Sequence, residues 1–255
     1  MPRVDCLSGK IRLSMWRRGR MEAIYSYDDI LKMMDQLLKE KTRFNWNQFY
    51  LDRNRKVPFF SNRPDENVVE YFYKGLFIPG SRVLELGCGP GRNALYFAEN
   101  GCQVDAVDSS EESLKWGRER AKESGLAINF IHNNIFDLDV NEASYDIVFD
   151  SGCFHHIAPH RRISYNELLK RALKTGGVYG LTCFSENGKY GGAPLTDWDV
   201  YREWSIKGGI GFTAQKLRDN FKDLREIEIR KMRQMDLNDG VFAEDGFLAA
   251  IFKKE

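Results

Sequence analysis

Hydrophobic and polar positions change period repeatedly between residues 80 and 184. Short apolar runs, each long enough for one β-strand, cover 83–86, 102–108, 128–132, 145–150 and 178–184. Longer stretches with the helical spacing of apolar residues alternate with them, at 92–100, 111–124 and 160–174. Strands that alternate with helices predict an α/β fold with a mostly parallel sheet and helices on both of its faces. Right-handed crossovers then require a doubly wound strand order.

The last part of the chain follows a different pattern. A helix is predicted near 213–221, and two apolar runs follow it at 225–232 and 246–252. A DLNDG turn separates these two runs, which predicts two antiparallel strands. We therefore expect a C-terminal antiparallel hairpin beside the parallel strands.

Two segments interrupt the regular pattern and are candidates for lids. Residues 21–61 combine a helix, at whose start Ser26 and Asp29 resemble a capping box, with an aromatic-rich stretch. Residues 185–211 form a loop rich in glycine and aromatic side chains, and long irregular loops in compact domains are usually functional or mobile. We expect 21–61 to be a helical N-terminal lid, 62–255 to be the α/β domain, and 185–211 to cover the acceptor site.

Composition narrows the class of protein. The chain has 38 basic and 37 acidic residues, so its net charge of +1 predicts no nucleic-acid or membrane partner. No apolar stretch is long enough to span a bilayer. Its five cysteines include no C-x-x-C pair, and no secretory segment is evident, so we expect a reduced, cytoplasmic protein. The basic residues 1–20 are interpreted as a targeting segment or an upstream extension, in either case outside the fold. The oligomeric state stays open.

A glycine-rich turn follows the first predicted strand, in the stretch LELGCGPGRNALYF (residues 84–97). A helix that starts at such a turn offers free N–H groups and a positive potential to a carboxylate or phosphate. With Ala94 in the last place the turn reads as the G-x-G-x-x-A of a dinucleotide site. With Glu85 in the first place it reads as the E-x-G-x-G-x-G of a methyl-donor site. The glycines alone leave both cofactors open.

Residues around the turn favour the methyl donor. Asp108, at the end of the second strand, is suited to accept hydrogen bonds from a ribose diol, which both cofactors have. Glu85 would meet the ammonium group of S-adenosylmethionine but would repel the pyrophosphate of NAD. Asn134 can accept from the adenine amine, and the backbone N–H of Ile135 can donate to the ring. In addition, the closing hairpin stands where a dinucleotide fold has a second mononucleotide half.

These stretches resemble the ordered motifs of the class I S-adenosylmethionine-dependent methyltransferases. VLELGCGPGRNALYFAENG resembles their first motif, and VDAVDSS, NNIFDL, YDIVFDSGCFHHI and LKTGGVYGLTCF resemble the later ones. The family usually has Asp where this chain has Asn134, and Pro where it has Thr175. GCGPGRN is similar to the tellurite-resistance and thiopurine methyltransferase branch, which acts on small molecules. The resemblance covers about 62–184 and implies a Rossmann-like, seven-stranded sheet whose last strand runs antiparallel.

Site residues follow from the motifs and from the predicted sheet edge. The expected donor-binding residues are Glu85, Gly87, Cys88, Gly89, Gly91, Asp108, Ser109, Asn134, Ile135 and Asp150. The candidate catalytic residues, which follow the fourth strand, are His155 and His156; either can instead cap a helix or bond to the backbone. The aromatic residues expected to bind the acceptor are Trp46, Tyr50, Tyr190 and Trp198. No metal site is expected, because Cys153 and Cys183 read best as buried small residues.

The predicted activity is methyl transfer from S-adenosylmethionine to a small-molecule acceptor, a thiol, chalcogen or hydroxyl, with S-adenosylhomocysteine as product. The leaving group is a neutral thioether that needs no acid, so positioning of the reactants supplies most of the rate. Two alternatives stay open: a non-catalytic S-adenosylmethionine-binding partner protein and an NAD-dependent oxidoreductase. A methyltransferase acting on protein or RNA is the rival within the same class.

Overall fold

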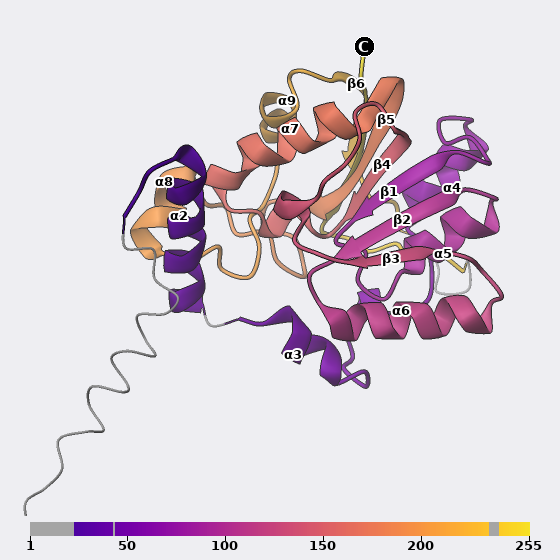
Figure 1. Cartoon of the computed structure of the whole chain (residues 1–255), viewed down its shortest axis with the longest axis horizontal. Coiled ribbons are helices and arrows are strands. Elements are labelled where there is room, and N and C mark those ends of the chain that lie inside the picture. Colours follow the sequence, from indigo (N-terminus) through magenta and orange to yellow (C-terminus); the bar gives the residue numbers. More distant parts are fainter. Residues whose placement is uncertain (1–22, 43, 235–239) are drawn as a thin grey trace, which may run out of the picture.

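The computed structural model describes residues 23–42, 44–234 and 240–255, so the predicted extension at 1–20 lies outside the described residues. A seven-stranded sheet with helices on both faces forms the body of the protein (Figure 1). Its strands are β1 (Arg82–Leu86), β2 (Gln103–Asp108), β3 (Asn129–His132), β4 (Tyr145–Ser151), β5 (Leu173–Phe184), β6 (Arg225–Lys231) and β7 (Phe247–Lys253). Their spatial order is β3-β2-β1-β4-β5-β7-β6.

Strand directions confirm the predicted fold class. Strands β1 to β5 pair in parallel, whereas β7 runs antiparallel to both of its neighbours, β5 and β6. The order reverses at β1, which lies between β2 and β4, as in other doubly wound sheets. Strand β7 closes the predicted hairpin with β6, which forms the outer edge of the sheet.

The first three helices precede strand β1, and the others connect the strands. The helices are α2 (Tyr27–Thr42), α3 (Trp46–Leu51), α4 (Glu66–Tyr73), α5 (Arg92–Glu99), α6 (Glu111–Glu123), α7 (Arg162–Ala172), α8 (Asp197–Glu203) and α9 (Ala214–Asn220). Short 3-10 turns are η1 (Pro58–Phe60), η2 (Ile135–Asp137), η3 (Phe154–His156) and η4 (Pro159–Arg161). The predicted capping box of α2 is present, because Asp29 N donates to Ser26 Oγ (3.2 Å) and Ser26 N donates to Asp29 Oδ2 (2.9 Å).

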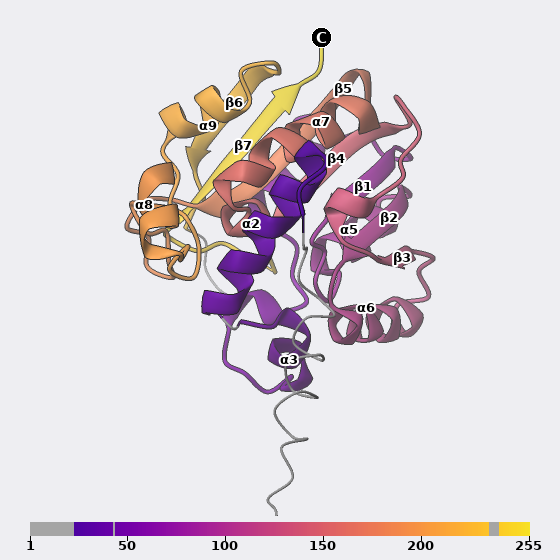
Figure 2. The same cartoon turned by 60° about the vertical axis from the view of Figure 1, so that its left-hand side comes forward.

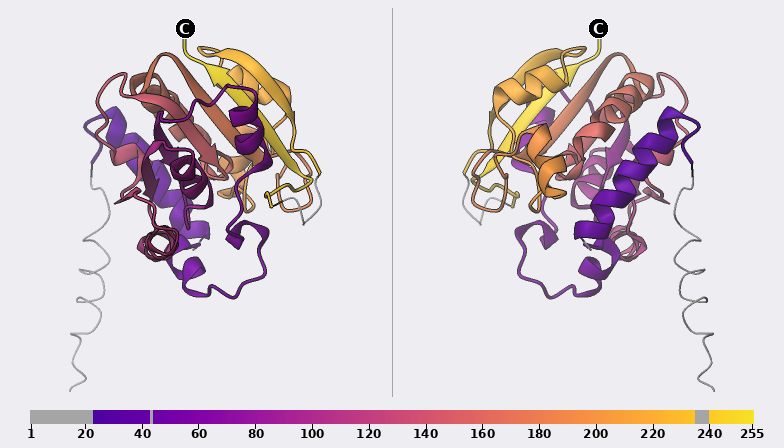
Figure 3. Two further views of the ribbon diagram at one scale, coloured as in Figure 1. Left: turned by 90° about the vertical axis from the view of Figure 1, so that its right-hand side faces the viewer. Right: turned by 90° about the vertical axis from the view of Figure 1, so that its left-hand side faces the viewer.

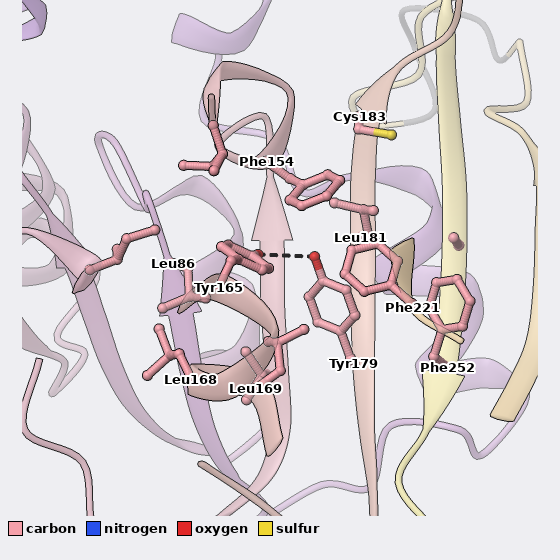
Figure 4. Packing of buried hydrophobic residues seen from close by; sticks show 14 of the residues in the cluster. Leu86, Phe154, Tyr165, Leu168, Leu169, Tyr179, Leu181, Cys183, Phe221 and Phe252 are labelled. Atoms are coloured by element: carbon pink, nitrogen blue, oxygen red, sulfur yellow. Dashed lines mark hydrogen bonds between the residues drawn. The ribbon is translucent and has the colours of Figure 1, made fainter. Parts of the chain in front are cut away.

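Two hydrophobic cores lie on opposite faces of the sheet. Successive side chains of β1 alternate between them: Leu84 and Leu86 face the core of α7 and α9, while Val83 faces the core of α4 and α5. Figure 4 shows part of the first core, in which the Tyr165 and Tyr179 hydroxyls are 2.9 Å apart. Because helices cover both faces, the central strands are buried along nearly their whole length.

Two element boundaries differ from the sequence prediction. The helix expected over 160–174 ends at Ala172, and β5 begins at Leu173, well before the predicted start at residue 178. The reason is that Leu173 already pairs with Tyr145 across the sheet. The loop expected over 185–211 contains α8, whose N-cap residue Thr196 accepts a hydrogen bond from Asp199 N (3.2 Å).

The N-terminal helix α2 packs across the α7 side of the sheet (Figures 2 and 3). Asp35 of α2 accepts from His160 Nε2 (2.9 Å) and from the Arg161 guanidinium (2.6 Å). His160 Nδ1 in turn lies 2.8 Å from the Tyr201 hydroxyl of α8. The side chain of His160 therefore connects the N-terminal segment to the loop after β5. Among the described residues, no helix has the length and apolar character needed to cross a bilayer.

Candidate active site

A cavity of about 390 Å³ opens beyond the carboxyl ends of β1, β2, β3 and β4. Four chain segments at this edge contribute to its wall, at 87–90, 108–109, 133–136 and, except for the buried Phe154, 151–157. Ligands of open α/β sheets bind at this edge, near the point where the strand order reverses. The volume lies within the usual range for small-molecule sites.

The glycine turn after β1 forms one wall of the cavity and admits no larger side chain. Gly87 and Gly89 have φ values of +66° and +54°, in the left-handed region that side chains disfavour. A Cβ atom on Gly87 would lie 2.5 Å from Cys153 Cβ, and one on Gly89 would lie 3.0 Å from the Tyr50 hydroxyl. The left-handed backbone therefore favours glycine at both positions, and at Gly87 the overlap with Cys153 is a second, independent reason. Gly91 stands outside the cavity wall and is the N-cap residue of α5.

Asp108 lies where a ribose diol could reach it. Its Oδ2 accepts from Gly89 N (2.8 Å) and its Oδ1 accepts from Ser110 N (2.8 Å). Burial raises the pKa of this carboxyl, and these backbone N–H groups oppose the shift. Each carboxylate oxygen keeps a lone pair for a ligand hydroxyl, because a carboxylate can accept about four hydrogen bonds. Helix α6 is capped by Ser110 and not by Asp108.

Four of the other predicted donor residues also line the cavity: Cys88, Ser109, Asn134 and Ile135. Asn134 Oδ1 accepts from Phe136 N (3.1 Å), so this side chain also caps η2. One lone pair of that oxygen remains for a ligand amine. The neighbouring Asn133, which the sequence analysis did not select, lines the cavity as well.

Glu85 and Asp150 are not among the residues that line the cavity, and their contact with the donor stays a prediction. Side chains within a strand point to one face of the sheet or the other, and only residues at or beyond the strand ends reach its edge. Glu85 is 2% exposed, and its Oε2 has no hydrogen-bond partner in the part of the chain that the structure describes. Asp150 accepts from Cys153 N (2.9 Å), Phe154 N (3.2 Å) and the Tyr165 hydroxyl (2.7 Å), so it holds η3 in place.

Glu85 should make stability depend on pH. Burial raises its pKa from 4.5 to about 8, although the Arg92 charge opposes the shift. Between pH 4.5 and 8 this carboxyl is therefore protonated in the folded protein but ionised in the unfolded chain. The free energy of unfolding consequently falls as the pH rises from 4.5 toward 8. Glu85→Gln cannot ionise, so at pH 7 it should raise the free energy of unfolding by about 3 kcal/mol. Urea unfolding of the ligand-free protein at several pH values measures this effect.

The exposed Glu99 on α5 offers the matched control for this change. Glu99→Gln makes the same chemical substitution where solvent reaches the carboxylate, and it should change stability by less than about 0.5 kcal/mol. If Glu85→Gln is no more stable than wild type at pH 7, Glu85 is ionised in the folded protein and its pKa is not raised.

The two histidines after β4 both line the cavity, in different surroundings. His155 stacks on Phe184, with ring centroids 3.7 Å apart, and its Nδ1 accepts from Phe184 N (3.2 Å). His156 packs against Trp46, with centroids 4.9 Å apart. Burial lowers the pKa of His155 well below its usual range and that of His156 to about 4. Both imidazoles are therefore neutral near pH 7.

The predicted acceptor-binding aromatics separate into two groups. Trp46, Tyr50 and Tyr190 line the cavity, whereas Trp198 is 73% exposed and stands outside its wall. Helix α8 buries Val200, and the Trp198 ring contacts solvent and Arg202 instead. The helical period of α8 explains the difference, because residues two positions apart point in different directions.

Sequence reasoning missed several residues of the cavity wall. Arg92 opens α5 directly after the glycine turn; its guanidinium forms an ion pair with Asp65 and donates to Ser151 Oγ (2.8 Å). Its position at the start of that helix, next to the glycine turn, could have identified Arg92 from the sequence. Phe242 and Phe247 come from the far end of the chain and carried no motif. Within the described residues, no cluster of three His, Cys, Asp or Glu side chains could hold a metal ion.

The known proteins to which the chain is similar include several methyltransferases. A family model described as "Methyltransferase domain" matches residues 83–177. A probable fatty acid methyltransferase of Mycobacterium tuberculosis is 28% identical over 165 residues, which cover 63% of this chain and 38% of the relative. A ubiquinone biosynthesis O-methyltransferase of Idiomarina loihiensis is 36% identical over 122 residues, covering 48% and 49%. The chain thus spans half or less of the length of these two relatives.

Solved structures support the same assignment of the fold. One, from work on the conversion of a disulfide bond into a thioacetal group during echinomycin biosynthesis, has a TM-score of 0.61 at 25% identity. It covers 82% of this chain and 90% of that one. TehB from Haemophilus influenzae has a TM-score of 0.54 at 22% identity, covering 74% and 62%. Taken with the ordered motifs, the sheet order and the cavity, these findings support a class I S-adenosylmethionine-dependent methyltransferase, with the methyltransferase domain matched over residues 83–177.

Proposed function

We propose that this chain transfers a methyl group from S-adenosylmethionine to a small-molecule acceptor. The observation that carries the proposal is one cavity that joins two kinds of wall. At one end lie the glycine turn, Asp108 and Asn134, which suit a nucleoside with an amino-acid tail. At the other end lie His156 and Trp46, which would contact a second molecule. A purely non-catalytic binding protein has no need of that second region.

The residues of the chain would supply positioning, hydrogen bonds and a dry environment. When bound, S-adenosylmethionine would supply an electrophilic methyl group on a sulfonium, which an acceptor lone pair would displace from sulfur with neutral S-adenosylhomocysteine as the leaving group. An acceptor hydroxyl or thiol gives up its proton, for which His156, neutral and at the cavity wall, is the candidate recipient.

Both proposed lids contribute aromatic residues to the cavity wall. Trp46 and Tyr50 come from the segment 21–61, of which residues from 23 onward are described, and Tyr190 comes from the loop 185–211. Aromatic rings around a sulfonium attract it through their π-faces and exclude water. We assign these segments as donor and acceptor lids over the domain 62–255. The cytoplasmic location and the absence of nucleic-acid and membrane partners stay predictions, and the oligomeric state is open.

Two binding measurements and one transfer measurement test the proposal. Calorimetry should detect binding of S-adenosylmethionine and S-adenosylhomocysteine but not of NADH; binding of NADH alone would favour the oxidoreductase. Transfer of a labelled methyl group should then be measured on a panel of thiol, phenol, amine and chalcogenide acceptors. Donor binding without transfer to any panel member would favour the non-catalytic partner protein.

Trp46→Ala should raise the KM for the acceptor by about tenfold or more, because the cavity loses a wall that covers the reacting groups. Steady-state kinetics at saturating S-adenosylmethionine measures this change, with the best acceptor of the panel. Trp198→Ala is the matched control, since it removes the same side chain from a surface outside the cavity. Equal effects of the two substitutions would mean that Trp46 does not cover the acceptor.

A further inference from the structure

The acceptor end of the cavity is built from aromatic rings. Phe184 at the end of β5 packs against Phe247 at the start of β7, with ring centroids 5.1 Å apart. Phe242 lies next to Phe247, at 5.9 Å, and Trp46 closes the opposite side through His156. Such walls favour a flat ring, which gains stacking and edge-to-face contacts beyond the burial of its surface.

The described residues of this region offer no unpaired charge to a ligand. Among the described residues that line the cavity, only Arg92 and Asp108 carry a formal charge near pH 7, because burial keeps the two histidines neutral. Asp108 belongs to the donor end, and Arg92 is already paired with Asp65. An acceptor with a carboxylate, phosphate or ammonium group would lose its hydration there without gaining a counter-ion.

His155 is restricted to one tautomer by the backbone. Its Nδ1 accepts a hydrogen bond from Phe184 N, so in the neutral ring the proton must reside on Nε2. The stacked contact with Phe184 holds the ring plane. Over the described ranges of the chain, no protein group pairs with Nε2. His155 lines the cavity with Nε2–H as the ring group left for a ligand, so we infer that it acts as a hydrogen-bond donor and not as the base.

His156 differs because neither of its ring nitrogens has a partner among the residues that the structure describes. Its neutral ring offers one donor and one acceptor, and its centroid lies 4.3 Å from that of His155. The two imidazoles thus present a fixed donor beside an available acceptor. Two neighbouring polar atoms on one ring would match this pair.

We propose that the methyl acceptor is an uncharged, planar aromatic or heteroaromatic compound with two adjacent polar atoms. One of them accepts a hydrogen bond from His155 Nε2–H, and the other is the nucleophilic hydroxyl, which faces His156. The inference rests on the proposed function and adds to it the acceptor class and separate roles for the two histidines. His155 orients the acceptor, whereas His156 receives the hydroxyl proton as the oxygen–methyl bond forms.

Binding of four simple probes to the full chain saturated with S-adenosylhomocysteine tests the acceptor class without any turnover. Catechol is neutral with two adjacent hydroxyls, phenol lacks the second one, protocatechuate adds a carboxylate, and dopamine adds an ammonium group. Calorimetry should show catechol binding about tenfold or more tightly than either charged analogue, and about threefold to tenfold more tightly than phenol. Tighter binding of a charged analogue, or no binding of any probe, would overturn the proposal.

Variants of His155 test its role as a donor. His155→Leu should remove the advantage of catechol over phenol, whereas His155→Gln, whose amide N–H can replace Nε2–H, should keep most of it. Unchanged affinity for S-adenosylhomocysteine shows that both variants are folded. If the leucine and glutamine variants both lose affinity for catechol and phenol to the same extent, the role of His155 is structural and the inference fails. Failure of S-adenosylhomocysteine itself to bind wild type would instead contradict the proposed function.

Discussion

Asp108→Ala is expected to weaken binding of S-adenosylhomocysteine by about a hundredfold or more. A ribose diol would donate two hydrogen bonds to this carboxylate, and each bond to a charged acceptor contributes roughly 1.5–3 kcal/mol. The substitution also removes the acceptor that holds the Gly89 N–H in the glycine turn, which adds to the loss. Calorimetry with S-adenosylhomocysteine measures the change directly, since this compound does not turn over.

Asp105 on the same strand supplies the control. Its carboxylate accepts from Asn129 Nδ2 (2.7 Å) and the Tyr145 hydroxyl (2.8 Å) and pairs with Arg82, but it lies outside the cavity wall. Asp105→Ala should lower stability without changing donor affinity. Asp108→Asn, which keeps one carbonyl oxygen, should fall between wild type and Asp108→Ala. Equal donor affinities of the two alanine variants would show that the ribose assignment is wrong.

Gly87→Ala is expected to reduce both stability and donor binding, because the new methyl group would overlap Cys153 Cβ. A left-handed backbone at alanine costs roughly 1–2 kcal/mol, and overpacking adds about 1–3 kcal/mol. Relief of the overlap would shift the glycine turn or η3, both of which line the cavity. Urea unfolding measures the first effect, and calorimetry with S-adenosylhomocysteine measures the second.

Gly125 separates the cost of the left-handed backbone from the cost of the overlap. It has nearly the same backbone angle as Gly87, φ +67°, but nothing lies within 4 Å of an added Cβ. Gly125→Ala should therefore show only the backbone term and bind the donor normally. Adding Cys153→Gly to Gly87→Ala removes the clashing atoms and should recover part of the lost stability. If Gly87→Ala behaves like Gly125→Ala, the close approach to Cys153 has no consequence for the site.

Residues at strand ends and in turns could be assigned to the site from the chain itself. The glycine turn was identified by its spacing, and Asp108 by its place at the end of an apolar run. Their positions depend on local backbone structure and on the rule that parallel strands end at one edge. Glu85 and Asp150 lie one or more residues inside their strands, where the alternation of side chains turns them away from that edge, so their contact with the donor stays a prediction.

The roles of the two histidines could not be separated before the structure was known. Both follow β4 in the chain and both line the cavity. What distinguishes them is one backbone N–H, that of Phe184 on β5, which donates to Nδ1 of His155, whereas no described residue pairs with the ring nitrogens of His156. A contact between segments so far apart in the chain has no local signature.

Periodicity and motif spacing were enough to predict the α/β class, the doubly wound sheet and the part of the cavity wall that the glycine turn, Asp108 and Asn134 form. They suffice because the alternation of apolar and polar residues indicates which faces are buried, and because this turn and these strand ends are continuous segments of chain. The aromatic part of the wall was decided only by tertiary packing. It combines Trp46, His156, Phe184, Tyr190, Phe242 and Phe247. These residues meet through packing between distant elements, and the direction of each side chain is set by its neighbours in space and not by its neighbours in sequence.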